Sequence, residues 1–185
     1  MYAPNVFTLD VAAMMSGGVD LEAANGVLAV TLYSANGLKP NDIFGSLDPY
    51  CAFHVGNVHS PELARSTAVE NSNNPKWNET HFLLLNNLND PLLFRVMDRN
   101  TGRNDAEVGV ATLDLQEVKE NQNAIEGLNL VLLRSGKPVG EIKADVCYFP
   151  VSKPEKKEDG TVIPAAESSK VFSLFFIFKI TYFFL

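Results

Sequence analysis

The chain has 185 residues, of which 46% are hydrophobic and 20% are charged, and this composition suits one folded domain with flanking segments. The formal net charge of −7 at pH 7 argues against nucleic acid as a partner, because binding to phosphates requires a basic surface. An acidic protein can still bind an anionic bilayer when a cation lies between the two surfaces or when basic residues gather locally.

Residues 1–25 form an arm of small and apolar residues that contains the pair Gly17-Gly18. The arm is too short to be a domain, and we interpret it as the end of an upstream segment. The first basic residue is Lys39, so the positively charged start of a secretory signal is missing. This pattern indicates a protein that works on the cytosolic side of membranes.

Residues 26–150 have the pattern of an all-β domain. Short runs that are rich in β-branched and aromatic residues alternate with Asn, Asp, Gly and Pro clusters, which mark turns. The predicted strands are Val27–Tyr33, Tyr50–Val55, Leu63–Val69, His81–Leu85, Leu92–Met97, Val108–Leu113, Leu128–Leu133 and Ile142–Tyr148. Eight such strands predict an eight-stranded antiparallel β-sandwich, with one short helix near Leu115–Asn121.

The last predicted strand has the clearest alternation. Ile142, Ala144 and Val146 alternate with charged residues at the positions between them. Side chains of successive strand residues point to opposite faces of a sheet, so this strand should have one dry face and one solvated face.

Two loops concentrate oxygen-bearing side chains. The loop from Gly37 to Asp48 carries Asp42 and Asp48. The loop from Asp98 to Glu107 carries Asp98, Asn100, Asn104, Asp105 and Glu107. Calcium takes six to eight oxygen ligands, and like charges pack together only when a cation neutralises them. Asp and Asn are also ordinary turn residues, which is the better interpretation for either loop alone. The two loops together favour a cation site.

These loops resemble those of C2 domains. Leu38–Asp42 followed by Ser46–Tyr50 resembles the first calcium-binding loop of that family, and Asn74–Glu79 resembles its "NPxWNE" turn. Val96–Asn100, followed by Val108-Gly109, resembles the third loop and the strand after it. The motifs occur in the family's order across residues 26–150. They are most similar to the first C2 domain of the tricalbin and extended-synaptotagmin group.

The resemblance also implies a cellular setting. In that group the first C2 domain follows a lipid-carrying SMP domain, and Pro4–Asp10 looks like the joining segment. We therefore expect the chain to be a fragment that lacks the SMP domain. Its expected location is the cytoplasmic face of membranes at contacts between endoplasmic reticulum and plasma membrane, with anionic phospholipid as its partner.

The resemblance further implies a calcium ligand set, and this chain departs from it. The family uses five loop acids, and three of them match Asp42, Asp48 and Asp98. Asn100 keeps an oxygen but loses the charge at the fourth position. The fifth position falls on Ala106, although the neighbouring Asp105 could substitute. Fewer carboxylates lower the affinity for the ion, so one weak calcium site or none is expected.

Ile43 and Phe44 lie beside Asp42 at the predicted tip of the first loop. Exposed apolar residues at such a tip could enter the interfacial region of a bilayer, where burial of one side chain contributes about 1.5–3 kcal/mol. The alternative is that Phe44 folds back on the sandwich. We predict membrane contact for both residues.

Residues 151–170 form a charged linker, and residues 171–185 form a hydrophobic tail (VFSLFFIFKITYFFL). A helix over this tail would span about 22 Å, which is short of the roughly 30 Å core of a bilayer, and Lys179 interrupts it. The tail could be an anchor, an interfacial segment or a segment foreign to the family that arises from gene-model read-through. We favour the third interpretation.

The sequence contains no GxSxG, P-loop, HExxH or GxGxxG pattern, so we predict a protein that is not an enzyme. Cys51 and Cys147 fall in strand-like runs and are predicted to be buried thiols. The predicted function is calcium-assisted docking on phospholipid membrane, within a tether or lipid-transfer type of protein. Two alternatives remain: a calcium-independent C2-like domain that binds a protein partner, which Asn100 and Ala106 favour, and a tail-anchored membrane protein.

Overall fold

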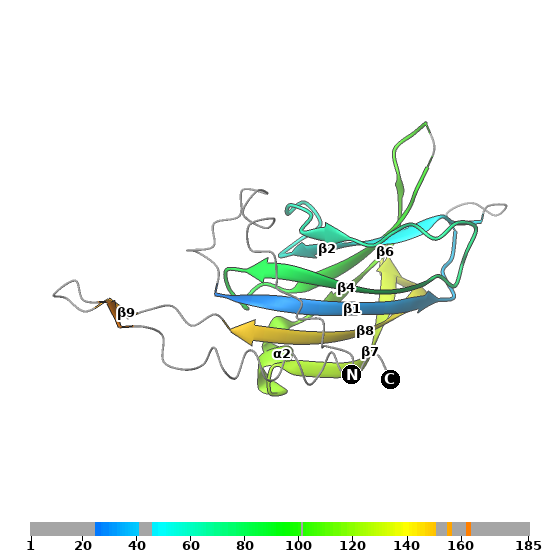
Figure 1. Cartoon of the computed structure of the whole chain (residues 1–185). Coiled ribbons are helices and arrows are strands. Elements are labelled where there is room, and N and C mark those ends of the chain that lie inside the picture. The colour runs from blue at the N-terminus through cyan, green and yellow to red at the C-terminus, as the bar shows by residue number, and fades with distance from the viewer. Residues whose placement is uncertain (1–24, 41–45, 101, 151–154, 157–161, 164–185) are drawn as a thin grey trace, which may run out of the picture. The chain divides into compact units, whose positions relative to one another are not determined.

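The computed structural model describes residues 25–40, 46–100, 102–150, 155–156 and 162–163 (Figure 1). The predictions for Asp42, Ile43, Phe44 and the tail 171–185 lie outside the described residues. Gly26–Phe149 forms one compact unit. In the other unit, β9 (Glu155–Lys156) pairs with β10 (Val162–Ile163), so the predicted linker contains a short pair of strands.

The described residues of the main unit form eight strands and one helix, as the alternating pattern predicted. The strands are β1 (Gly26–Asn36), β2 (Pro49–Val55), β3 (Ala64–Arg65), β4 (Lys76–Leu85), β5 (Leu92–Asp98), β6 (Ala106–Leu113), β7 (Ala124–Arg134) and β8 (Lys137–Pro150). The helix α2 (Leu115–Glu120) connects β6 to β7, and Asp114 caps it by accepting the N–H of Gln116.

The strands are neighbours in the order β3-β2-β5-β6-β7-β8-β1-β4. Between β6 and β7 the pairing is limited to Val110 and Leu133, so the sheet divides there into two halves of four strands. The apolar faces of the two halves supply one core. The predicted antiparallel β-sandwich is confirmed.

The core follows the predicted alternation. In β1, Leu28, Val30 and Leu32 are fully buried. In β2 and β5, Phe53 and Phe94 are directly opposite in register, and their rings meet edge to face with centroids 5.5 Å apart. Burial of each such side chain contributes about 1.5–3 kcal/mol, so these layers fix the register of the strands.

Seven strands are longer than predicted, and β3 is shorter. β4 begins at Lys76, so the last four residues of the Asn74–Glu79 motif are strand and not turn. Trp77 is buried in the core as a packing anchor. β3 is only Ala64–Arg65, although a longer strand was predicted. The segment still follows β2, because Ser66 and Val69 donate their N–H groups to carbonyls of β2, but the spacing is irregular.

Cys51 and Cys147 are both thiols and form no disulfide. Cys51 is fully buried, as predicted, and its burial raises the pKa of the thiol. Cys147 is only half-buried, so the prediction of a buried thiol was wrong there, because its side chain points away from the core that Val146 and Tyr148 enter. Within the described residues, none of the helices has the length and apolarity required to cross a bilayer.

Candidate functional site

Three connections meet where β2 begins and β5 ends. Pro49 and Asp98 are paired in register, which brings the end of the loop before β2 next to the start of the β5–β6 loop. The β3–β4 loop joins them, because Ser72 donates its N–H to the carbonyl of Leu47 at 2.8 Å. We call this region the loop rim; its described residues are Ser46–Asp48, Glu70–Ser72, Asp98–Asn100 and Gly102–Asp105.

The structure brings together two of the predicted site residues, Asp48 and Asp98. The backbone N–H of Asp48 donates to Oδ1 of Asp98 at 2.8 Å. In turn, the N–H of Asn71 donates to Oδ1 of Asp48 at 2.8 Å, and the N–H of Arg99 donates to the carbonyl of Asp48 at 3.1 Å. The backbone donors thus come from all three connections, and both carboxylates lie at the same end of the sandwich.

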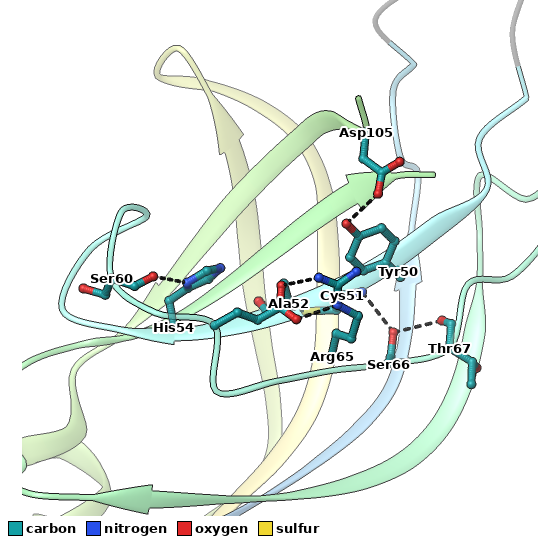
Figure 2. Close-up of polar contacts among 10 residues, drawn as sticks. Tyr50, Cys51, Ala52, His54, Ser60, Arg65, Ser66, Thr67 and Asp105 are labelled. Atoms are coloured by element: carbon teal, nitrogen blue, oxygen red, sulfur yellow. Dashed lines mark hydrogen bonds and ion pairs between the residues drawn. The ribbon is translucent and has the colours of Figure 1, made fainter. Parts of the chain in front are cut away.

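The side chain of Asp105 points toward the hydroxyl of Tyr50 on β2 (Figure 2). Its Oδ1 accepts the N–H of Asn100 at 2.8 Å, and its Oδ2 accepts the hydroxyl of Tyr50 at 2.8 Å. The hydrogen bond from Asn100, together with that from Tyr50, holds the pKa of Asp105 below its usual value. Burial and the bond to Asp105 raise the pKa of Tyr50 to about 12. Oδ2 thus fastens the β5–β6 loop to β2, and Oδ1 closes a turn within the loop.

Asn100 also uses its side chain inside the loop. Its Nδ2 donates to the carbonyl of Asp98 at 3.1 Å and to that of Asn104 at 3.4 Å. Its Oδ1 accepts Nε–H of Arg103 at 3.0 Å. Asn100 therefore stabilises the turn, as the alternative interpretation of these Asn and Asp residues expected. The matching position Ala106 lies in β6, opposite Asp98.

Arginines surround the rim, and sequence reasoning missed most of their contacts. Nη2 of Arg99 lies 3.8 Å from Oδ2 of Asp48 and 3.3 Å from Oε1 of Glu70. Arg65 pairs with Glu62, and its guanidinium carbon lies 5.0 Å from the ring centroid of Tyr50 (Figure 2). For the contacts of Arg99, the only indication in the sequence was that it directly follows Asp98.

Arg134, at the end of β7, binds the base of the first loop. Nη1 donates to the carbonyls of Lys39 at 3.1 Å and Val108 at 3.3 Å, and Nη2 donates to the carbonyl of Pro40 at 3.5 Å. The guanidinium thereby joins the backbone that leads into residues 41–45 to the backbone of β6. No local pattern could have predicted this contact, since two of the partners are 94 and 95 positions away.

The sequence motifs imply a calcium site. The rim has oxygen ligands of the kind that calcium prefers, but the described residues do not supply a full set of them. Asp48 and Asp98 provide the hard carboxylate oxygens that calcium prefers. Asp105 and Asn100 direct their oxygens to other groups. Within the described part of the chain, no group of three or more His, Cys, Asp and Glu side chains is placed to hold a metal ion. The described residues thus fit two ligands of a weak site.

The sequence of the chain matches known proteins across this unit. Residues 26–130 match a family model described as C2 domain. Tricalbin-3 of Saccharomyces cerevisiae is 35% identical over 166 residues, which cover 88% of this chain and 10% of that protein. Tricalbin-1 of the same yeast is 30% identical over 161 residues, which cover 86% of this chain and 13% of that protein. The chain therefore spans only about an eighth or less of the length of these relatives.

Solved structures share the fold. The first C2 domain of plant Extended Synaptotagmin 1 superposes with a TM-score of 0.58 at 23% identity, covering 70% of this chain and 98% of that one. The pair of C2 domains of Extended-Synaptotagmin 2, in a calcium-bound structure, gives a TM-score of 0.56 at 23% identity, covering 69% of this chain and 46% of that one. The loop rim lies within the residues matched by the family model.

Proposed function

Because the chain belongs to the C2 domain family, we propose that it docks on phospholipid membrane through the loop rim, with weak assistance from calcium. The observation that carries the proposal is the meeting of two acidic loops at one end of the sandwich. The N–H of Asp48 bonds to the carboxylate of Asp98 at 2.8 Å, so the two carboxylates share one surface. Anionic phospholipid is the proposed partner.

Calcium would be held by Asp48 and Asp98, with Asp42 as the third acid of the predicted set. Asn100 and Asp105 would take part only after giving up contacts inside their loop, and this is why we propose weak binding. Calcium held by these carboxylates would neutralise their charge and would supply positive charge for lipid phosphates.

Apolar contact completes the proposed docking surface. Ile43 and Phe44 belong to the same loop as Asp42, and we propose that they enter the interfacial region of the bilayer. The contacts of Arg134 with the carbonyls of Lys39 and Pro40 support this role, since they hold the base of that loop beside β6.

The relatives suggest where such a module would act. Tricalbins and extended synaptotagmins are similar to this chain, and we propose a non-enzymatic module, residues 26–150, of a tether or lipid-transfer type of protein. Its proposed location is the cytoplasmic face of contacts between endoplasmic reticulum and plasma membrane. In this arrangement the domain supplies attachment to the bilayer.

A second candidate is a calcium-independent domain that binds a protein partner. The specific observation in its favour is that both oxygens of Asp105 and the side chain of Asn100 already have partners within the chain. Such a domain would bind neither calcium nor vesicles.

Vesicle sedimentation tests the proposal. The full chain is mixed with phosphatidylcholine vesicles that contain or lack phosphatidylserine, in calcium or in chelator. We expect the protein to pellet with the anionic vesicles, and we expect calcium to increase the pelleted fraction. The increase should be smaller for Asp98→Asn than for the control Asp90→Asn. Asp90 is exposed in the β4–β5 turn, at the other end of β5, so the control makes the same charge change away from the rim.

The outcomes separate the candidates. Failure to pellet on anionic vesicles in both calcium and chelator would reject membrane docking and favour the protein-binding candidate. Pelleting that resists carbonate and disappears when residues 171–185 are deleted would favour a tail anchor. Equal calcium dependence in Asp98→Asn and Asp90→Asn would reject the rim as the site of calcium action.

A further inference from the structure

Arg99 lies at a fixed place on the loop rim. It follows Asp98, the last residue of β5, and its N–H bonds to the carbonyl of Asp48 at 3.1 Å, which extends the ladder between β2 and β5 by one step. From this anchored backbone the guanidinium reaches two acids on the two other connections. Nη2 is 3.8 Å from Oδ2 of Asp48 and 3.3 Å from Oε1 of Glu70.

The two oxygens of Asp48 have different surroundings. Oδ1 accepts the N–H of Asn71 and is therefore part of the loop structure. Oδ2 faces the guanidinium of Arg99. A cation that binds the outer oxygen of Asp48 must consequently share it with Arg99 or displace the arginine from it.

A positive charge at this position compensates the negative charges of the rim carboxylates. Asp48 and Asp98 lie close together, and adjacent carboxylates are stable in their charged forms only when cations or hydrogen bonds compensate them. The guanidinium is charged at every pH that a folded protein meets, so its compensating charge does not depend on pH.

We propose that Arg99 is a tethered counter-ion of the loop rim, which neutralises Asp48 and competes with a divalent cation for its outer oxygen. This inference rests on the proposed function, since it requires a divalent cation to bind at the rim. Competition from Arg99 is a second cause of weak calcium binding, separate from the absence of a carboxylate at residue 100.

The exchange of one cation for the other is feasible because the ion pair is exposed. The side chain of Arg99 is 47% exposed and that of Asp48 is 32% exposed, and exposed ion pairs contribute little stability. When Arg99 leaves Asp48 it still has Glu70, which lies closer and is more exposed. Glu70 therefore holds the guanidinium near the rim while a divalent cation occupies Asp48, and the arginine can return when the ion leaves.

Calorimetric titration of calcium into the full chain, without vesicles, tests the competition. Arg99→Gln removes the tethered charge, and Lys119→Gln makes the same charge change on α2, which follows the end of β6 that is remote from the rim. We expect Arg99→Gln to bind calcium about two- to fivefold more tightly than Lys119→Gln, which is the range set by one exposed ion pair.

A second measurement applies to the unaltered chain, in case Arg99→Gln folds poorly. The NMR resonance of the Nε–H group of Arg99 should shift as calcium is added, and that of Arg134, whose guanidinium binds backbone carbonyls, should shift less. Equal or weaker calcium binding by Arg99→Gln, an unmoved Arg99 resonance, or no binding heat from any of the proteins would overturn the competition.

These outcomes are distinct from failure of the docking proposal. Unaltered calcium affinity in Arg99→Gln, combined with retained pelleting on anionic vesicles, would overturn the counter-ion alone. Tighter calcium binding in Arg99→Gln, combined with no pelleting of either protein, would overturn membrane docking and leave the counter-ion standing.

Discussion

The middle and the ends of the same two strands, β2 and β5, behave differently. In the middle, Phe53 and Phe94 are opposite each other and fully buried, and their positions follow from the apolar pattern of the strands. At the rim, Asp48 and Asp98 are half-buried and are held by backbone N–H groups. The core therefore sets the register of the strands, and the register then brings the two carboxylates together.

The largest expected effect is in the middle of the strands. Phe94→Ala should lower the free energy of unfolding by about 3–5 kcal/mol, because the truncation leaves a cavity in a close-packed core. Urea denaturation measures the change. Val131→Ala, at a side chain that is 49% exposed, is the control and should change stability by less than about 0.5 kcal/mol. Similar losses in the two variants would contradict the division between a core and a surface.

Arg134→Met should have the next largest effect, because three backbone carbonyls lose their donor. Loss of such bonds costs about 1–3 kcal/mol in the free energy of unfolding, again measured in urea. Lys137→Met, at the exposed first residue of β8, makes the same charge change. If the two variants are equally stable, Arg134 does not hold the base of the first loop.

Tyr50→Phe removes one hydrogen bond at the rim and leaves the ring in place. We expect a loss of about 0.5–1.5 kcal/mol, since the bond goes to a carboxylate that is partly solvated. A proteolysis time course measures the accompanying effect on the β5–β6 loop, which should be cleaved faster than in the unaltered chain. Unchanged stability and unchanged cleavage would show that Asp105 is held by Asn100 alone.

The stability of Asp105→Asn relative to the unaltered chain should depend on pH. The folded pKa of Asp105 is depressed, so its ionised form is the one that the fold stabilises. That stabilisation is complete above the ordinary value of about 3.9 and is lost as the pH falls through the lower folded value. The stability difference between the unaltered chain and Asp105→Asn should therefore shrink below about pH 4. A stability difference that stays constant across this pH range would contradict stabilisation of the fold by ionised Asp105.

The apolar pattern was sufficient for most of the fold. The alternation at Ile142, Ala144 and Val146 predicted one buried face, and the strong apolar runs located the strands. The length of β3 was overestimated, because the segment follows β2 through irregular hydrogen bonds that a propensity does not encode.

The rim was predictable only in part. The resemblance to C2 domains placed Asp48 and Asp98 in adjoining loops, and the strand register agrees with that placement. The partners of Arg99 and Arg134 could not be predicted, since they depend on which loops meet in space. Glu70 is 29 positions from Arg99, and Pro40 is 94 positions from Arg134.

The central claim is that the loop rim faces the membrane, and an environment-sensitive dye at the rim tests it most directly. Ser46→Cys and Lys119→Cys are each labelled in a Cys147→Ser background, in which the remaining Cys51 is fully buried. With phosphatidylserine vesicles and calcium, the dye at residue 46 should shift to the blue and return with chelator, and the dye at residue 119 should not change. A shift at residue 119 alone, or no shift at either position, would contradict the account.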